Sequence, residues 1–319
     1  MTKVLANDGI AENGLEMLQS AGFEVITEKV EQDQLANEIN SQGIEVLLVR
    51  SATKVREDLI DQVPNLKMIG RGGVGMDNID VEYAESKGIK VFNTPASSSS
   101  SVAELAIAHM FALSRFVHNA NREMPSKGVS EFKALKKAYS KGFELDGKTL
   151  GIIGFGRIGQ ETARRAIGLG MKVVAHNLHD MSGEVKIKLH DAHGNDITCY
   201  AEMKSKEEVL KEADILTLHV PGGGSALIGE AELDLMKNGS YLINTARGGV
   251  VDEEALLKAL DSGKLSGAAL DVFINEPTPD ERLLNHDKIS VTPHIGASTN
   301  EAQTRIGAEL ASIIIEHYK

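Results

Sequence analysis

Short apolar runs alternate with helix-like stretches along almost the whole chain, and this alternation limits the possible folds more than any other feature. In the first hundred residues the runs KVLA, FEVIT, IEVLLVR, LKMIG and IKVFN are separated by polar stretches with helical character. Such alternation predicts parallel strands joined by crossover helices. Several of the stretches end at glycines that suit a left-handed helix cap, namely Gly22, Gly43 and Gly88. We therefore expect one α/β unit here.

A second alternating series begins near residue 148. Its six runs, KTLGIIGFG, KVVAHN, ADILTLHV, GSYLINTA, LSGAALDV and KISVTPH, predict a doubly wound nucleotide-binding sheet. Between the second and third runs, VKIKLHDAHGNDITCY has two alternating segments around a turn-rich centre, which predicts a β-hairpin. The serine-rich stretch NTPASSSSS separates the two series, and it predicts either a loop that ends in an N-cap at Ser101 or a flexible linker.

The composition excludes several classes of function. The 319 residues carry a formal net charge of −12 at pH 7, so we expect no nucleic acid and no anionic membrane as the main partner. The single cysteine, Cys199, cannot form an internal disulfide, and MTKVLANDGI lacks the apolar core of a signal peptide. No apolar run approaches the length of a membrane span. We expect a cytoplasmic protein and no metal site.

A glycine-rich turn indicates the cofactor. Gly154, Gly156 and Gly159 follow the apolar run TLGII and open the helix-like stretch IGQETARRAIGLG. In this context, backbone N–H groups and the start of the helix can bind a pyrophosphate. Arg157 adds a donor at the same turn, although a solvated surface charge explains it nearly as well. We infer a dinucleotide site.

The end of the following strand departs from the usual dinucleotide pattern. An acidic residue about twenty positions after the glycines normally binds the adenosine ribose, and this chain has Asn177 there. Asparagine keeps an acceptor for the ribose hydroxyls but loses the charge that repels the 2′-phosphate of NADP. The neighbouring His176 and His179 supply no permanent positive charge, and Asp180 would oppose a phosphate. We expect NAD to be preferred, with use of NADP not excluded.

Three polar residues follow strands of the second series, where open α/β sheets bind their ligands. They are Arg247 in NTARGG, Glu276 in LDVFINEP and His294 in VTPHIGAST. An arginine can hold a carboxylate through two hydrogen bonds, a histidine can exchange a proton near neutral pH, and a carboxylate can orient its ring. Each residue alone has an ordinary structural explanation. Together, beside a dinucleotide turn, they predict the oxidation of a hydroxy acid.

The segments LVRSATKV, GRGGVGMDNID, GIIGFGRIG, NTARGGVVDE, LDVFINEP and TPHIGAST resemble, in this order and spacing, the D-2-hydroxyacid dehydrogenase family, and within it the phosphoglycerate dehydrogenases most closely. The resemblance covers nearly the whole chain. It implies a Rossmann-type doubly wound NAD-binding domain over residues 100–295. This domain would be inserted into a smaller flavodoxin-like α/β substrate domain made of residues 1–99 and 296–319. It also implies a homodimer built around the nucleotide-binding domains.

The resemblance further implies roles for individual residues. His294 corresponds to the catalytic acid/base, Glu276 to its partner, and Arg247 to the cation that orients the substrate. The implied cofactor-binding residues are Gly154, Gly156, Arg157, Ile158, Gly159, Asn177, His219, Val220, Pro221, Thr245, Ala246, Asp271 and Gly296. The implied substrate-binding residues are Arg50, Ser51, Arg71, Gly72 and Gly73.

Three functions stay open at this point. The first is the NAD-dependent oxidation of 3-phosphoglycerate to 3-phosphohydroxypyruvate in serine biosynthesis. The second is the reduction of glyoxylate or hydroxypyruvate on the same scaffold, and the third is a non-catalytic, dinucleotide-sensing binding protein. The acidic charge and the complete set of arginine, glutamate and histidine argue against the third.

The chain departs from its relatives in length as well. The hairpin near residues 185–199 is longer than the usual link, and the sequence ends without the C-terminal regulatory module that many relatives carry, so we expect no serine feedback through such a module. A lysine-rich segment lies in a region that approaches the site in relatives. We expect a solvated helix face there, with contact to a substrate phosphate as the alternative, for Lys133, Lys136, Lys137 and Lys141.

Overall fold

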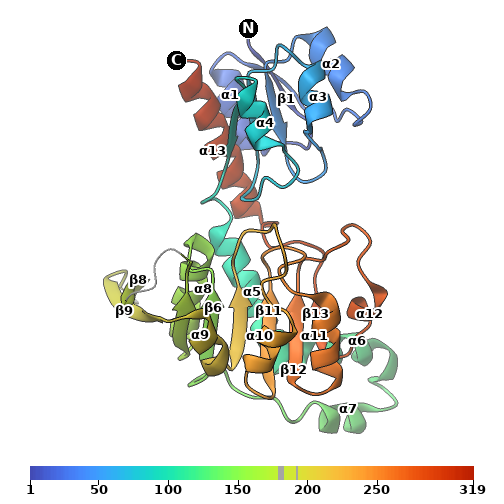
Figure 1. Cartoon of the computed structure of the whole chain (residues 1–319), viewed down its shortest axis with the longest axis vertical. Coiled ribbons are helices and arrows are strands. Elements are labelled where there is room, and N and C mark those ends of the chain that lie inside the picture. The colour runs from blue at the N-terminus through green and yellow to red at the C-terminus, as the bar shows by residue number, and fades with distance from the viewer. Residues whose placement is uncertain (179–182, 192) are drawn as a thin grey trace. The chain divides into compact units, whose positions relative to one another are not determined.

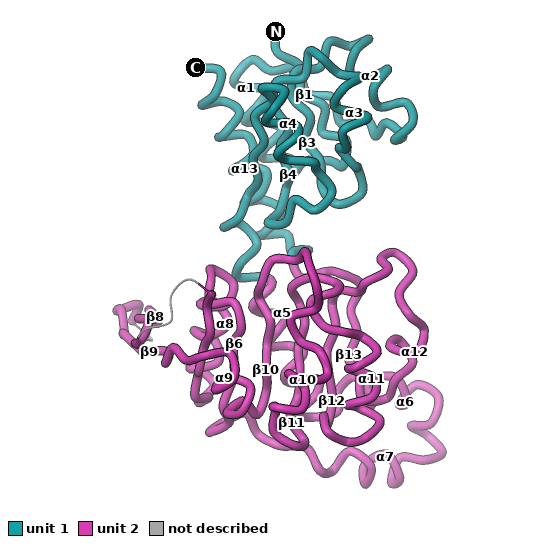
Figure 2. The backbone as a smooth tube through the Cα atoms, in the orientation of Figure 1, with its two compact units in different colours: residues 1–101, 297–319 teal, residues 102–296 magenta. Residues whose placement is uncertain are grey.

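The computed structural model describes residues 1–178, 183–191 and 193–319, and the chain divides into two compact units (Figures 1 and 2). Unit 1 comprises Met1–Ser101 and Ala297–Lys319, and unit 2 comprises Val102–Gly296. Both chain termini belong to unit 1 (Figure 2). His179 and Asp180, which the sequence places near the expected ribose site, lie outside the described residues. The assignment of residues 1–99 and 296–319 to substrate and of residues 100–295 to NAD stays a prediction.

Unit 1 is a five-stranded parallel sheet with helices on both faces. The strands follow the order β2-β1-β3-β4-β5, which is the flavodoxin-like order. This confirms the expected fold class for this part of the chain. The elements are β1 (Lys3–Ala6), α1 (Glu12–Ser20), β2 (Glu24–Ile26), α2 (Leu35–Gln42), β3 (Val46–Val49), α3 (Glu57–Gln62), β4 (Met68–Arg71), α4 (Val81–Ser86), β5 (Lys90–Asn93) and α13 (Asn300–His317).

The strands of unit 1 are apolar on both faces because helices cover both. Val4 packs in one apolar cluster with residues of α1 and α13, while its neighbour Leu5 packs in another with residues of α2 and α3. The helices α1 and α13 approach each other closely, since a Cβ atom on Gly14 would lie 2.5 Å from the carbonyl oxygen of Gly307. The final helix of the chain is thus part of the core of unit 1.

Unit 2 is built on an eight-stranded sheet in the order β13-β12-β11-β10-β6-β7-β9-β8. All pairs are parallel except β8 with β9, and two apolar clusters cover the two faces, as in a doubly wound fold. The elements are α5 (Ser99–Ser114), which joins the units, α6 (Val117–Lys127), α7 (Phe132–Ala138), β6 (Thr149–Ile153), α8 (Arg157–Gly168), β7 (Lys172–His176), β8 (Glu184–His190), β9 (Asp196–Met203), α9 (Lys206–Glu212), β10 (Ile215–Leu218), α10 (Glu230–Leu235), β11 (Ser240–Asn244), α11 (Glu253–Asp261), β12 (Leu265–Leu270), α12 (Glu281–Leu284) and β13 (Ile289–Val291).

The predicted hairpin is formed by β8 and β9, but it also extends the sheet. The end of β9 pairs in parallel with β7, through Val174 with Glu202 and Ala175 with Met203. The hairpin therefore supplies the strand beyond β7 in the parallel series, and β8 becomes the antiparallel edge.

The predicted N-cap at Ser101 is wrong. Helix α5 already begins at Ser99, and the Ser101 hydroxyl lies 2.8 Å from that of Thr299. Ser97 and Ser98 are buried as well, at 5% and 1% exposure, so this stretch is not a solvated linker. A run of serines has no apolar pattern that would reveal such burial.

No single helix in the part of the chain that the structure describes has both the length and the apolarity needed to cross a membrane. Among the described helices, α5 and α6 taken together pass such a test, and they are bent by 61° relative to each other.

Candidate active site

The three glycines of the turn between β6 and α8 have different surroundings. A Cβ atom on Gly154, whose φ is +94°, would lie 2.3 Å from the carbonyl oxygen of His219, and one on Gly159 would lie 2.3 Å from that of Gly154. These two glycines allow close packing of the turn. A Cβ atom on Gly156 would meet nothing within 4 Å, and no side chain caps α8 at this residue. The open space beside the uncapped helix start fits a pyrophosphate.

This difference predicts opposite effects for two alanine substitutions. Gly156→Ala should change the free energy of unfolding by less than about 1 kcal/mol, because its φ of −79° suits alanine. It should nevertheless weaken NAD binding by tenfold or more, since the methyl group occupies the pyrophosphate space. Gly159→Ala should cost about 1–3 kcal/mol of stability through overpacking. Thermal unfolding and NAD titration of both variants provide the measurement, and unchanged NAD affinity in Gly156→Ala would contradict the assignment.

Two buried polar atoms at the ends of β10 and β11 also fit a bound cofactor. Burial lowers the pKa of His219 to about 3, so its ring is neutral at pH 7. Its Nε2 lies 3.2 Å from the hydroxyls of both Thr162 and Thr217, and the Thr162 hydroxyl donates its proton to the carbonyl of Ile158. Neither Nδ1 of His219 nor the hydroxyl of Thr245 has a hydrogen-bond partner among the described residues.

Asn177 directly follows β7, and the last residue of that strand, His176, is hydrogen-bonded to the segment after β9. The preceding His176 places Nδ1 3.1 Å from the carbonyl oxygen of Lys204, which follows β9. Asn177 itself is half-buried, and Arg157 at the start of α8 is exposed. The structure therefore leaves both interpretations of Arg157 open. The other predicted cofactor residues of this unit, Val220, Pro221 and Ala246, follow β10 and β11.

His294 and Glu276 are in direct contact. Glu276 Oε2 lies 2.7 Å from His294 Nδ1, and Glu276 Oε1 accepts a hydrogen bond of 3.0 Å from the backbone N–H of Phe273. The carboxylate is thus oriented from both sides and orients the ring in turn. Both side chains are partly exposed, at 43% and 36%. His294 has a φ of +53°, a left-handed conformation that costs a non-glycine residue about 1–3 kcal/mol and that often occurs at functional sites.

Arg247 follows β11, whose neighbour β12 precedes Glu276. Asn244 shapes its loop, since the amide Nδ2 donates to the Arg247 carbonyl over 3.0 Å and Oδ1 accepts from Ala246 N–H over 3.0 Å. A Cβ atom on Gly248 would lie 1.9 Å from the Phe273 carbonyl oxygen. Only glycine at this position lets the arginine loop pack against the segment that bonds Glu276.

Asp271 directly follows β12 and is 1% exposed. Its carboxylate accepts the backbone N–H groups of Ile295 and Gly296, over 2.8 and 2.9 Å, and the hydroxyl of Thr292 over 2.6 Å. Burial raises the pKa of Asp271, and the three donors act against that shift. The side chain predicted to contact the cofactor is therefore also bonded to the segment around His294.

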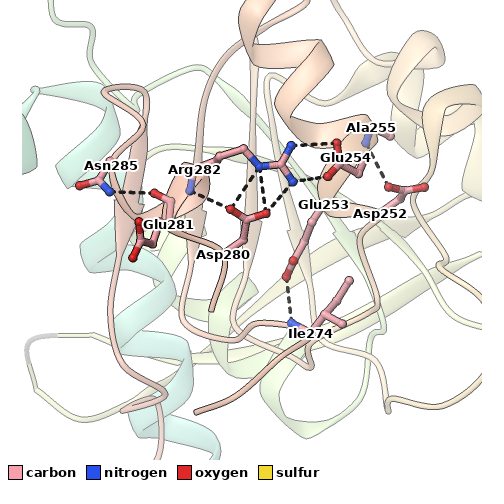
Figure 3. Close-up of polar contacts among 9 residues, drawn as sticks. All are labelled: Asp252, Glu253, Glu254, Ala255, Ile274, Asp280, Glu281, Arg282 and Asn285. Atoms are coloured by element: carbon pink, nitrogen blue, oxygen red, sulfur yellow. Dashed lines mark hydrogen bonds and ion pairs between the residues drawn. The ribbon is translucent and has the colours of Figure 1, made fainter. Parts of the chain in front are cut away.

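Side chains of α11 and α12 support the segment that carries Glu276 (Figure 3). Glu253, the first residue of α11, accepts the Ile274 N–H over 2.9 Å, and burial raises the pKa of its carboxyl. Arg282 lies between Asp280 and Glu254 and bonds both carboxylates. These ion pairs are exposed, so each contributes little to stability, but together they connect the segment to α11.

The predicted substrate-binding residues of unit 1 lie where β3 and β4 end. Arg50 follows β3, and Arg71 is the last residue of β4, where it pairs with Val49. Asp8 holds the first of these loops, accepting the N–H groups of Arg50 and Thr53 over 2.7 and 3.0 Å. A Cβ atom on Gly73 would lie 2.5 Å from Arg71 Nη1, so glycine leaves room for that guanidinium. Ser51 is exposed, and Gly72 follows β4.

Sequence reasoning missed Asn244, Glu253 and Asp8, whose side chains hydrogen-bond the backbone of loops near predicted site residues. The position of Asp8 in a turn directly after a strand was a usable signal. The hydrogen bond between Glu253 and Ile274 links residues that are 21 positions apart, and no local sequence pattern predicts it.

A dinucleotide turn and a paired histidine and carboxylate on one doubly wound sheet define a nicotinamide-dependent oxidoreductase. Comparison with known proteins agrees. Residues 107–296 match the family model described as "D-isomer specific 2-hydroxyacid dehydrogenase, NAD binding domain". The chain belongs to the D-isomer specific 2-hydroxyacid dehydrogenase family, whose members are NAD-dependent oxidoreductases.

Individual relatives cover the chain almost completely. A hydroxypyruvate reductase of Thermotoga maritima is 43% identical over 98% of this chain and 97% of its own length. A D-3-phosphoglycerate dehydrogenase of Methanocaldococcus jannaschii is 40% identical over 98% of this chain, which spans 57% of that relative. The structure of D-mandelate dehydrogenase from Rhodotorula graminis matches with a TM-score of 0.84 at 26% identity, covering 98% of this chain and 93% of that one.

Proposed function

We propose that this dehydrogenase oxidises 3-phosphoglycerate to 3-phosphohydroxypyruvate with NAD, as a step of serine biosynthesis. The observation that carries the chemistry is the 2.7 Å contact between His294 Nδ1 and Glu276 Oε2, in the loops that follow the neighbouring strands β13 and β12. NAD, when bound, accepts the hydride from C2 of the substrate.

The residues of this chain handle the proton and the carboxylate. His294 takes the proton of the C2 hydroxyl at Nε2, because Nδ1 is bonded to Glu276. Glu276 stabilises the positive charge that the ring then carries. Arg247 binds the substrate carboxylate through two parallel hydrogen bonds and so fixes C2 relative to the ring. In the reverse direction the protonated histidine donates to the keto oxygen.

The choice of a phosphorylated substrate is supported by the two arginines of unit 1. Arg50 follows β3 and Arg71 ends the neighbouring strand β4, and the fork of an arginine suits a phosphate. The lysines near residue 136 are exposed on α7 or just after it, which favours a solvated face for them.

Reduction of hydroxypyruvate is the second candidate, because the chain matches a hydroxypyruvate reductase over 97% of that relative's length. An initial-rate screen of 3-phosphoglycerate, glycerate, hydroxypyruvate and glyoxylate with both cofactors separates the two candidates.

We expect a preference for 3-phosphoglycerate over glycerate that disappears in Arg50→Ala. Equal rates with both hydroxy acids in the wild type would favour the reductase. A preference that survives in Arg50→Ala would move phosphate recognition to another group, the lysines of α7 being next. No turnover with any of these acids, despite NAD binding, would favour a non-catalytic binding protein.

Cofactor choice is expected to favour NAD at pH 7, with a modest margin. Asn177 offers the ribose an acceptor but does not repel a 2′-phosphate. Asn177→Asp should raise the ratio of kcat/KM for NAD over NADP by tenfold or more, because it restores that repulsion. The measurement is kcat/KM with both cofactors in both proteins, and a clear wild-type preference for NADP would show that a cation reaches the ribose.

We also propose that the chain is a cytoplasmic homodimer. Exposed apolar side chains on α5, α6 and α7 of unit 2 support self-association: Phe111, Val117, Met124 and Phe132 are 42–57% exposed. The mass in solution, from light scattering, tests this part of the proposal.

A further inference from the structure

A buried histidine outside the proposed acid/base pair is hydrogen-bonded toward the segment that carries His294. His109 lies on α5 and is 3% exposed. Its Nδ1 is 3.0 Å from the hydroxyl of Ser290 on β13, and its Nε2 is 3.1 Å from the hydroxyl of Thr292, which follows β13. Thr292 in turn bonds the carboxylate of Asp271 over 2.6 Å.

Counting donors fixes the direction of these bonds. The Thr292 hydroxyl has one proton, which it donates to Asp271, so its oxygen can only accept from His109. Nε2 of His109 must therefore carry the ring proton. Burial lowers the pKa of His109 to about 4, so the ring is neutral at pH 7 and Nδ1 accepts the proton of the Ser290 hydroxyl. Every donor in the series thus points from Ser290 toward Asp271.

The carboxylate at the end of this series also holds backbone beside the candidate acid/base. Asp271 accepts the N–H groups of Ile295 and Gly296, the two residues after His294. The left-handed φ of His294 is unfavourable by itself and persists only where its surroundings determine it. A carboxylate with fixed oxygens supplies such a constraint, and one of these oxygens is held by Thr292.

We propose that His109 is a positioning residue for the reaction: by donating to Thr292 it keeps the Thr292 hydroxyl directed at Asp271, and Asp271 then holds the segment of His294 in its working conformation. The inference rests on the proposed acid/base role of His294. His109 touches neither substrate nor cofactor in this account, and it acts only through its Nε2 proton.

Three substitutions separate this role from simple packing. His109→Leu removes the donor, His109→Gln places an amide N–H near the position of Nε2, and Ser290→Ala removes only the bond at the far side of the ring. With 3-phosphoglycerate and NAD as the assay, we expect His109→Leu to lower kcat by about 10–100-fold, the scale of a small misplacement of reacting groups. His109→Gln and Ser290→Ala should stay within about threefold of the wild type. Equal losses in the leucine and glutamine variants, or full activity in His109→Leu, would overturn the proposal.

A second pair of variants covers the case in which His109→Leu does not fold. Thr292→Val removes the hydroxyl at nearly constant volume, and Thr292→Ser keeps it. We expect a loss of kcat in the valine variant that the serine variant does not share, with no further loss when His109→Gln is added to Thr292→Val. Equal activity of Thr292→Val and Thr292→Ser would contradict the proposed role of the hydrogen bonds from His109 through Thr292 to Asp271.

Amide hydrogen exchange gives a readout that does not depend on turnover. Exchange at Ile295 and Gly296 should be faster in Thr292→Val and in His109→Leu than in the wild type, and unchanged in His109→Gln. His294→Ala, assayed beside these variants, separates the proposed acid/base role of His294 from the positioning role of His109. Full activity of His294→Ala would refute the proposed function, whereas an inactive His294→Ala together with an active, normally protected His109→Leu would refute the role of His109 alone.

Discussion

His294→Ala is expected to lower kcat by a factor on the order of 10²–10⁴ while leaving NAD affinity within about twofold, because a positioned acid/base contributes rate enhancement of that size. The substitution removes the atom that we propose accepts the C2 hydroxyl proton, but it does not alter the glycine turn or the start of α8. Steady-state rates and an NAD titration of the same preparation provide the measurement.

The chain offers a matched control for this substitution. His190 also pairs with a carboxylate, its Nδ1 lying 3.1 Å from Asp196 Oδ1, but the pair is exposed on the β8–β9 hairpin. His190→Ala should therefore keep the wild-type kcat. Near-normal turnover of His294→Ala, or an equal loss in His190→Ala, would refute the assignment of the acid/base.

Arg247→Ala should lower kcat/KM by a factor on the order of 10²–10⁴, with KM raised as well as kcat lowered. Two hydrogen bonds to a carboxylate contribute about 1.5–3 kcal/mol each, and about 1.4 kcal/mol corresponds to a factor of ten. Since the guanidinium would bind the substrate in both the ground and the transition state, both constants should change. Arg247→Lys should recover only part of the loss, because an ammonium group cannot form the parallel pair.

Arg56 provides the control for a lost arginine. It is an exposed residue of unit 1 that pairs with Asp80 over 2.7 Å, and its replacement by alanine should leave both constants unchanged. An unchanged KM in Arg247→Ala would contradict the proposed contact with the substrate.

The sequence predicted most of the fold because its signals are local. Each strand of unit 1 is an apolar run between polar stretches, and Gly22, Gly43 and Gly88 have the positive φ expected at helix ends. The pairing of β9 with β7 was not predictable in this way, because the turn-rich centre identified a hairpin but carried no sign of its second partner. The prediction for the serine stretch was wrong for the same reason, since the burial of these serines depends on residues such as Thr299 that are distant in the sequence.

In the candidate site, too, the features with a local sequence pattern were predictable and the long-range contacts were not. The sequence was enough to predict that Arg247, Glu276 and His294 each follow a strand, and the contact between the last two is present. What the sequence could not provide is the support of these residues. The bonds from Asp271 to the segment after His294 span 24 and 25 residues, and that from His109 to Thr292 spans 183. Such contacts follow from the packing of the sheet and its helices and not from any local pattern.

The most direct test of the central claim follows the hydrogen at C2 of the substrate. The purified chain is incubated with NAD and with either D-3-phosphoglycerate or D-glycerate that carries deuterium at C2, and the reduced cofactor is analysed by mass spectrometry. The account predicts NADH that has gained the deuterium, and no such product from deuterated L-glycerate. Unlabelled NADH, label from the L isomer, or no reduced cofactor with any of these acids would contradict it.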